Sequence, residues 1–432
     1  MSGPAGAGAV VVTGLGVLGA VASDPGDLGV ALRTGRGALA APRPPEDAGE
    51  PGVAWPAFTA ELAAEDTPDR ALEAVPDLPP DLRTLARRTA LRSPVAVRAA
   101  VVAALQAWRH AGLHRTAPPP DRVGIVVAGN NLTERVTEDG RLRAQRSAAY
   151  LPARYALHQQ DTDHVGTLSR VLGIRGEGCT VGGASASGNL ALAHGSRMLA
   201  AGAADVCVVV GAMTRLSTLQ TRGYLALGAM APAEGSPARA PAPFDTGRRG
   251  FHPGEAAACV VLESARSARG RGAAVLARLA GCAVVLDGNH LADPSVDGEV
   301  RAMRGALAQA GVGAGDIGWV SAHGTGSPLG DRTEAEALRE VFGTGDEGPW
   351  INATKALSGH CLGAAGVVEA VAAVVQLGAG FVHPDPGLLD PVDPGLRFVR
   401  EEARPVRDGF VLSNGFGFGG FNSAVVLAHP EA

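Results

Sequence analysis

The chain has 432 residues, of which 46% are hydrophobic and 19% are charged, and its formal net charge is −5 at pH 7. This length and apolar content are enough to bury a large core, which excludes a disordered protein. The negative net charge and the lack of lysine or arginine tracts argue against nucleic acid as a partner.

Neither export nor membrane insertion is expected from the sequence. The first residues, MSGPAGAGAVVVTG, lack the basic start and the apolar core of a signal peptide. No uninterrupted apolar run reaches the roughly 18 residues of a membrane span. The five cysteines have no C-x-x-C or zinc-ligand spacing, which is typical of a reduced interior and does not support a metal site. We therefore predict a cytoplasmic protein without a bound metal and with no membrane contact.

Short apolar runs alternate with helix-compatible segments along the chain. The runs predicted as strands lie at residues 10–15, 123–128, 205–210, 257–262, 274–285, 317–322, 350–353, 409–413 and 423–428. The segments predicted as helices lie at residues 81–92, 94–110 (with Ser93 as the cap), 186–201, 300–310, 332–341 and 362–377. This alternation predicts mostly parallel sheets with helices on both faces.

Three stretches interrupt the alternation. Residues 24–80 are rich in proline and glycine and are predicted to be irregular cover with short helices, and residues 220–249 are predicted to be a long loop. Residues 134–160 are charged and aperiodic, as in insertions that cover a site or meet a partner. The two parts of the chain share one layout, in which a helix begins near a reactive turn between an opening and a closing strand. We therefore predict a duplicated, layered α/β fold with halves at residues 1–255 and 256–432.

The segment GCTVGGASASGNLALAHGSRMLAA combines a small-residue turn with the start of a predicted helix. Ser185 stands just before this helix, beside its unpaired N–H groups and the positive end of its dipole. Such a position stabilises a nucleophile or a developing oxyanion. The alternative is a packing turn in which Ser185 only caps the helix.

Two histidines lie in glycine-rich segments next to predicted strands or helices. They are His323, in SAHGTGSPLGD, and His360, in NATKALSGHCLGAAG, where Lys355 precedes His360 by five residues. Sites in α/β folds gather at the carboxyl ends of strands. Two imidazoles at such a place can stabilise an enolate or move a proton near neutral pH. Each histidine taken alone could be a packing residue, but the pair together with a lysine indicates a site.

The run GFGFGG, residues 415–420, carries Phe416 and Phe418. It is either a glycine-rich hairpin with two core aromatic side chains or a phenylalanine gate hinged by glycines over a pocket. Other glycine runs do not make a nucleotide-binding fingerprint, since GTGSPLG lacks the Walker lysine.

Taken together, these segments resemble the β-ketoacyl synthases of the thiolase superfamily over essentially the whole chain. The matching segments are VVTGLG (11–16), GGASASGN (182–189), PFDTGRRGFHPGEAA (243–257), HGTGSPLGDRTEAEA (323–337), NATKALSGHCLGAAGVVEA (352–370) and LSNGFGFGGFN (412–422). The resemblance implies a thiolase-like duplicated α/β/α/β/α fold. It also implies a substrate tethered to the phosphopantetheine arm of an acyl carrier protein, no further cofactor, a homodimer, and in some relatives a ketosynthase as a partner.

The resemblance also implies roles for single residues. His323 and His360 would be the decarboxylation pair, with Lys355 and Glu369 as supporting charges. Phe416 would be the gate, and the backbone N–H groups of Ser185 and Phe416 would form the oxyanion hole. The substrate site is expected to include Thr325, Phe418 and Phe421.

One departure from the family bears directly on function. Ser185 stands where the family has its nucleophilic cysteine, and Cys179 belongs to the preceding strand. A cysteine at a helix start is partly thiolate and accepts an acyl chain, whereas a serine hydroxyl attacks only with a base to take its proton. Loading should therefore fail while the machinery for decarboxylation remains. The chain thus resembles the malonyl-acyl carrier protein decarboxylases of polyketide β-branching cassettes.

Three other interpretations stay open at this point. Ser185 could act as an oxygen nucleophile in acyl transfer or condensation, or the chain could be a non-catalytic partner similar to a chain length factor. The serine could also be a replacement made in a conventional synthase. Retention of both histidines and Lys355 argues against the non-catalytic interpretation.

Overall fold

The computed structural model describes residues 9–40, 56, 59–147, 149, 151–233, 242–406 and 409–432. The strands of its main sheet are β1 (Val10–Gly19), β2 (Val123–Ala128), β3 (Gly178–Val181), β4 (Val206–Gly211), β5 (Ala256–Ser264), β6 (Ala277–Leu286), β7 (Ile317–Ser321), β8 (Trp350–Asn352), β11 (Phe410–Gly417) and β12 (Phe421–Ala428). The short strands β9 (Phe381–Val382) and β10 (Arg404–Pro405) pair separately. The apolar runs predicted as strands are all strands, and β1, β5, β11 and β12 are longer than predicted.

The order of the strands shows that the fold is duplicated. The sheet runs β3-β2-β4-β5-β1 and then β6-β12-β11-β7-β8, so the second half repeats the first in mirror order about the β1–β6 contact. In each half the two parallel pairs lie at the outer end and the antiparallel pairs lie at the centre. By this order β5 is the counterpart of β12 and closes the first half, whereas the sequence had placed it at the opening of the second. The chain therefore passes from one half to the other between Ser264 and Ala277.

The sheet is mixed, so the prediction of mostly parallel sheets was wrong. The strands β1, β5, β6 and β12 run antiparallel to their neighbours. The reason is the hairpin of β11 and β12 and its counterpart β4–β5, where a strand returns along its predecessor. An alternating pattern of helices and strands in the sequence does not reveal these two returns.

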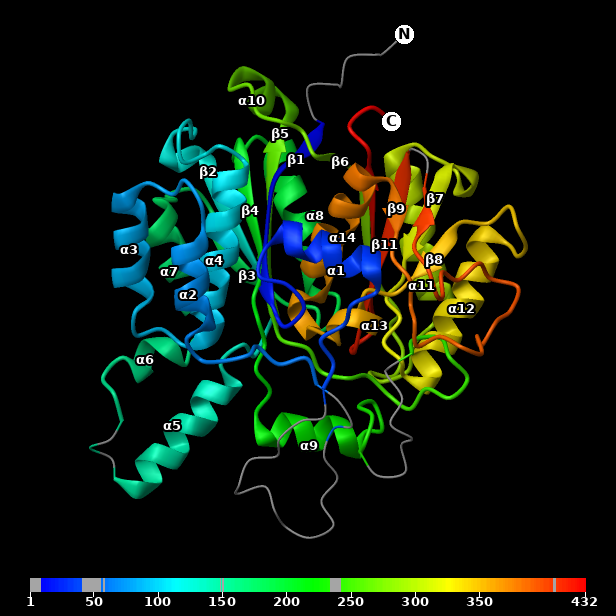
Figure 1. The fold of residues 1–432 in the computed structure, drawn as a ribbon, viewed down its shortest axis with the longest axis horizontal. Coiled ribbons are helices and arrows are strands. Elements are labelled where there is room, and N and C mark those ends of the chain that lie inside the picture. Colours follow the sequence, from blue (N-terminus) through cyan, green and yellow to red (C-terminus); the bar gives the residue numbers. More distant parts are fainter. Residues whose placement is uncertain are drawn as a thin grey trace.

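Helices cover the outer face of each half of the sheet, and further helices lie between the two halves (Figure 1). The described helices are α1 (Pro25–Thr34), α2 (Thr67–Ala74), α3 (Pro80–Ala90), α4 (Val95–His110), α5 (Glu134–Arg146), α6 (Tyr155–His158), α7 (Thr162–Leu172), α8 (Ser187–Ala200), α9 (Thr218–Ala226), α10 (Ala265–Gly270), α11 (Val296–Ala310), α12 (Pro328–Phe342), α13 (Lys355–Ser358) and α14 (Ala365–Ala379). In Figure 1, α4 and α7 lie outside the first half of the sheet, α8 and α14 lie between the halves, and α11 and α12 lie outside the second. This is the predicted α/β/α/β/α arrangement.

The central helices touch because their contact is made of glycines. A Cβ atom at Gly188 of α8 would lie 2.6 Å from the Cα atom of Gly366 in α14, so only glycine fits there. The segment Leu362–Ala379, which includes α14, is long and apolar enough to cross a membrane, but 78% of it is buried inside the protein. It is therefore a core helix of this fold.

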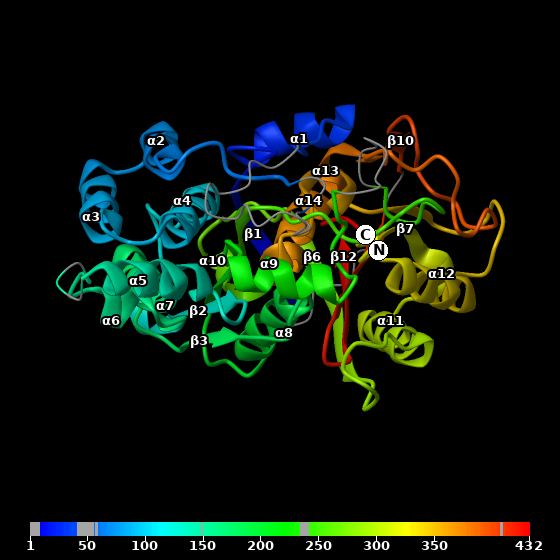
Figure 2. The same ribbon diagram turned by 90° about the horizontal axis from the view of Figure 1, so that it is seen from below.

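Several local predictions need correction. The helix α4 begins after Pro94, and no side chain caps it, so Ser93 is not its cap. The stretch predicted as a loop from residue 220 begins inside α9, and the aperiodic insertion folds into α5 and α6. Figure 2 shows α9 running across the middle of the molecule with α5 and α6 to one side. The Glu138 carboxylate of α5 accepts the Thr218 N–H at the start of α9 at 3.1 Å, which ties the insertion to this helix.

Candidate active site

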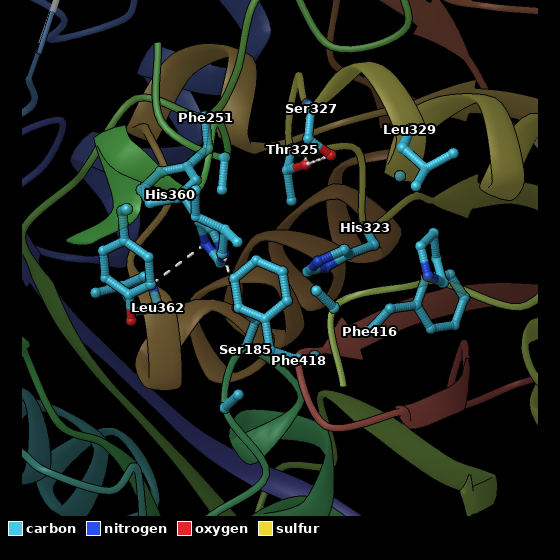
Figure 3. Close-up of a pocket in the computed structure, with 18 of the residues that line it drawn as sticks. Ser185, Phe251, His323, Thr325, Ser327, Leu329, His360, Leu362, Phe416 and Phe418 are labelled. Carbon is cyan, nitrogen blue, oxygen red and sulfur yellow. Dashed lines mark hydrogen bonds between the residues drawn. The ribbon is translucent and has the colours of Figure 1, made fainter. Parts of the chain in front are cut away.

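A cavity of about 520 Å³ lies where the two halves meet. Figure 3 shows the side chains that line it, with both histidine rings turned into it and Ser185 below them. The first half contributes Ser185 and the second half contributes all the other predicted residues found there, which are His323, Thr325, His360, Phe416 and Phe418. The residues singled out in the sequence are thus brought together from four separate segments.

A sharp turn presents Ser185 at the start of α8. Ala184 adopts a left-handed conformation with φ of +49°, which is uncommon for a residue other than glycine. The turn is closed by Ser187, whose hydroxyl accepts the Gly183 N–H at 2.9 Å and donates to the Ala184 carbonyl at 2.6 Å. The N-cap residue of α8 is Ala186, and no side chain forms a capping hydrogen bond. The alternative interpretation of Ser185 as the cap was therefore wrong. The Ser185 hydroxyl is left to face the cavity.

His360 contacts Ser185 through a nitrogen that carries the ring hydrogen. The His360 Nε2 and Ser185 Oγ atoms are 2.9 Å apart. On the other side of the ring, Nδ1 accepts the backbone N–H of Leu362 at 3.2 Å. A backbone nitrogen can only donate, so the hydrogen of the neutral ring must be on Nε2. His360 therefore donates toward Ser185 and the cavity and cannot take the proton of the serine.

His323 is held in the same tautomer by a buried lysine. The Lys355 Nζ atom lies 3.3 Å from His323 Nδ1 and 2.5 Å from the His323 carbonyl oxygen. Lys355 also forms an ion pair with Glu369 of α14, and both side chains are 2% exposed. An ammonium group has no acceptor, so His323 Nδ1 accepts and its Nε2 carries the hydrogen. The two rings meet edge to face with centroids 5.6 Å apart.

Both imidazoles are kept neutral by their surroundings. Burial, followed by the Lys355 charge and the neighbouring His360, lowers the pKa of His323 well below its usual range. Burial and the Lys355 charge likewise lower the pKa of His360. Burial raises the pKa of Glu369, and Lys355 opposes this effect. The site thus presents two neutral N–H donors to the cavity instead of an imidazolium and a base.

The predicted gate segment is mostly strand. β11 runs to Gly417 and β12 begins at Phe421, so the turn between them has only three residues. Phe416 is in β11, is 7% exposed, and its ring meets that of His323 edge to face at 5.6 Å. Phe418 lies in the turn, is 42% exposed, and stacks on Tyr224. Movement of Phe416 as a gate stays a prediction.

The backbone of this hairpin approaches the serine turn closely. A Cβ atom at Gly417 would lie 2.5 Å from the Gly183 carbonyl oxygen and 3.1 Å from the Ser185 nitrogen, so a side chain is excluded there. This contact brings the Phe416–Gly417 backbone beside Ser185. It is the arrangement that an oxyanion hole made by the N–H groups of Ser185 and Phe416 would require, and that role stays a prediction.

The other predicted residues have different surroundings. Thr325 lines the cavity, and its hydroxyl donates to Ser327 Oγ at 3.0 Å. Phe421 does not line the cavity, because its ring packs against Gly183 behind the serine turn. Lys355 contacts His323 from behind and pairs with Glu369, and the supporting role of these two residues stays a prediction. Cys179 is in β3, as predicted, and burial raises the pKa of its thiol.

Several residues of the site were missed in the sequence. Glu334 accepts the N–H groups of His323 and Gly324 at 2.8 and 2.7 Å and so fixes the His323 loop. Phe251 packs edge to face on His360 with ring centroids 5.3 Å apart. The acidic residues that follow the HGTGSPLGD segment were a signal for Glu334, but nothing in the sequence linked Phe251 to His360. No group of three potential metal ligands occurs in the parts of the chain described here.

Comparison with known proteins identifies relatives of the whole chain. Residues 7–268 match the model of the β-ketoacyl synthase N-terminal domain and residues 276–388 match that of the C-terminal domain. The polyketide biosynthesis malonyl-ACP decarboxylase PksF of Bacillus subtilis is 34% identical over 98% of this chain and 97% of that protein. A 3-oxoacyl-acyl-carrier-protein synthase 2 of Coxiella burnetii is 31% identical over 97% of this chain and 98% of that protein.

Solved structures give the same result for the fold. The ishigamide ketosynthase/chain length factor is 27% identical with a TM-score of 0.82, over 98% of this chain and 99% of that chain. A β-ketoacyl synthase from Burkholderia phymatum is also 27% identical, with a TM-score of 0.83 and the same coverage. The predicted thiolase-like fold is confirmed.

Proposed function

Because the chain belongs to the β-ketoacyl synthase family, we propose that it is the decarboxylase of this family that converts malonyl-acyl carrier protein to acetyl-acyl carrier protein in polyketide biosynthesis. The observation that carries the proposal is the hydrogen bond from the Leu362 N–H to His360 Nδ1. It leaves Ser185 without a base, while the cavity keeps two N–H donors for an enolate. The similarity to PksF over nearly the whole chain supports the same conclusion.

The two histidines would act on the thioester carbonyl of the malonyl group. Hydrogen bonds from both Nε2 atoms to this oxygen favour the state in which it carries negative charge. The bond between the α carbon and the carboxylate then breaks and CO₂ leaves. The electron pair of this bond stays with the α carbon and forms the enolate. Protonation of the α carbon gives the acetyl thioester. No acyl group has to be attached to the protein at any step.

Acyl transfer by Ser185 is the second candidate, and the 2.9 Å contact between Ser185 and His360 is what favours it. In an activated serine the partner nitrogen accepts the hydroxyl proton. Here that nitrogen carries a hydrogen, so the hydroxyl of Ser185 stays protonated and is a weak nucleophile. A role as a non-catalytic partner resembling a chain length factor would leave the buried Lys355–Glu369 pair behind His323 without a purpose.

The proposal includes the partners. The substrate would arrive on the phosphopantetheine arm of an acyl carrier protein, with Thr325 and Phe418 at the cavity as its first contacts. A homodimer is proposed from the family, and β3 supports it because this strand ends the sheet and pairs only with β2 among the described strands. A ketosynthase partner and a cytoplasmic location remain predictions.

The test is mass spectrometry of the carrier protein. Malonyl-loaded carrier protein is incubated with the purified chain and without any acyl primer, and the mass of the loaded arm is followed. The proposal expects loss of CO₂ and an acetyl-loaded product, with no adduct on the enzyme. A stable ester on Ser185, or an extended chain that forms only when a primer is added, would contradict it in favour of the second candidate.

A further inference from the structure

Glu299 is a buried glutamate that lines the same cavity as Ser185 and His323. It lies in the first turn of α11, and only 1% of its surface is exposed. Its Oε2 atom has no hydrogen-bond partner among the described residues. Leaving a buried polar atom unpaired is unfavourable, because the atom loses its hydrogen bonds to water without replacement. Such a group in a substrate cavity indicates a partner that is present only during the reaction.

The other acidic side chains buried in this cavity already have partners. Asp331 accepts the N–H groups of Phe244 and Gly326 at 2.6 and 3.0 Å. Glu334 accepts the His323 and Gly324 N–H groups described above, together with the Asn414 side chain at 3.0 Å. These carboxylates fix loops of the site. Among the residues that the structure describes, Glu299 has no such contact through Oε2.

Two more acidic residues line the cavity. Asp287 accepts from the Asn422 side chain at 2.6 Å, and Asp293 is exposed at the mouth, with 63% of its side chain accessible. Neither is a buried acid without a partner. Glu299 therefore differs from every other acidic residue that lines this cavity.

The surroundings keep Glu299 in its acid form. Burial raises the pKa of its carboxyl well above the usual range, and the nearby carboxyl groups of Glu334, Asp287 and Asp331 add to the effect. The raised pKa favours the protonated form of this side chain. A neutral carboxylic acid beside an enolate is a proton donor of suitable strength.

We propose that Glu299 donates the proton that the α carbon takes up after CO₂ has left. The assignment rests on the proposed decarboxylation and completes its last step. The C=C electron pair of the enolate forms the new bond between the α carbon and the Glu299 proton, and a lone pair of the enolate oxygen restores the carbonyl. Glu299 is left as a carboxylate and regains a proton from water through the open mouth of the cavity.

The two histidines are poorly suited to this step. Each is neutral and directs its one ring hydrogen toward the thioester oxygen. A histidine that gave this hydrogen to the oxygen would form an enol, which still needs a proton at carbon. The hydroxyl of Ser185 has a high pKa, so Ser185 is also a weak acid and a poor donor of this proton. Glu299 is the remaining buried acid that faces the cavity with a free oxygen.

The experiment compares two rates in the Glu299→Gln variant. The first is net formation of acetyl-carrier protein from malonyl-carrier protein. The second is exchange of ¹³CO₂ into the malonyl-carrier protein that has not reacted, measured by mass spectrometry. Without its proton donor the enolate survives longer and is carboxylated again more often. We expect net turnover to fall by about 10²-fold, the usual scale for a lost general acid, and the ratio of exchange to turnover to rise at least tenfold.

Control variants separate this role from a structural one. Glutamine is isosteric with protonated Glu299 and also neutral, so the variant should unfold at an unchanged temperature. Asp297→Asn, on the exposed side of the same helix turn, should change neither rate. Glu299→Asp keeps an acid and should give an intermediate ratio. A merely structural effect would lower exchange and turnover together and leave their ratio constant.

The possible outcomes distinguish this inference from the proposed function. Wild-type protein that releases no CO₂ from malonyl-carrier protein would overturn the decarboxylation itself. Wild-type protein that releases CO₂, with an unchanged exchange ratio in both Glu299 variants, would overturn only the role of Glu299.

Discussion

The turns ahead of α8 and α14 hold equivalent places in the two halves and carry different chemistry. Both follow the outermost strand of their half of the sheet, and both contain a left-handed residue other than glycine, Ala184 with φ of +49° and Leu362 with φ of +50°. The first turn presents only the hydroxyl of Ser185. The second presents His360 and uses the N–H of Leu362 to fix its ring.

This difference shows how a duplicated fold divides its work. Two equal turns face each other across the contact of α8 with α14, which brings Ser185 and His360 within 2.9 Å. The buried ion pair of Lys355 and Glu369, which contacts His323, lies on the second side. The first half thus places the Ser185 hydroxyl at the cavity, and the second half supplies the two imidazoles together with the groups that orient them.

The largest effect is expected from breaking the contact between the halves. In Gly188→Val the new Cβ would lie 2.6 Å from backbone atoms of α14, which cannot move without separating the central helices. We expect no folded protein on expression, as judged by solubility and circular dichroism. Gly223→Ala is the matched control, since nothing lies within 4 Å of its Cβ position, and alanine favours a helix by about 1 kcal/mol. A folded Gly188→Val protein would contradict this account.

The next largest effect is expected from removing one partner of the buried Lys355–Glu369 ion pair of the second half. Lys355→Met leaves Glu369 buried without its partner and should lower the free energy of unfolding by about 3–5 kcal/mol in a urea titration. The double variant Lys355→Met/Glu369→Leu should recover most of this loss. The exposed pair Arg70–Asp66 in the first half is the control, because its removal should cost less than about 0.5 kcal/mol. An equal loss of unfolding free energy at the buried pair and at the exposed pair would contradict this prediction.

The histidine of the second turn should matter more than the serine of the first. His360→Ala removes one of two donors to the enolate oxygen, so decarboxylation should slow by about 10²-fold or more. His194→Ala, on the exposed side of α8, should have no effect on the rate. The measurement is initial rates of CO₂ release from malonyl-carrier protein. Unchanged turnover would exclude the proposed mechanism.

Ser185→Ala tests the first turn directly. A serine that is never acylated contributes at most a hydrogen bond, so the rate of CO₂ release should fall by less than about threefold. Loss of activity comparable to that of His360→Ala would mean that Ser185 takes a covalent part, as in the second candidate function.

The smallest effect is that of mild acid on the rate. The pKa values of His323 and His360 are lowered by burial and by Lys355, so both rings stay neutral donors when the pH falls from 7.5 to 6. The turnover number should change by less than about twofold over this range. Two ordinary histidines of pKa 6.5 would become charged and reduce it by about tenfold or more. Such a drop, in protein shown to remain folded, would contradict the assigned electrostatics.

Much of the fold and part of the site could be predicted from the sequence. The apolar runs predicted at 123–128 and 205–210 are the strands β2 and β4, because β-branched residues between turn residues pack on both faces of a sheet. The motifs around Ser185, His323 and His360 identified the family and the residues at the cavity. The replacement of cysteine by Ser185 is visible in the sequence alone, and the proposal of decarboxylation without acylation begins from it.

The tertiary structure alone decided what these residues can do. The sequence had no means to show that Leu362 donates to His360, that Lys355 meets His323, or that β5 closes the first half of the sheet. Nor could it single out Glu299, which in the sequence stands just before the helix predicted at residues 300–310. The physical reason is that proton location and pKa depend on burial and on partners that packing brings within hydrogen-bond distance. Those contacts join segments far apart in the chain, and no local pattern records them.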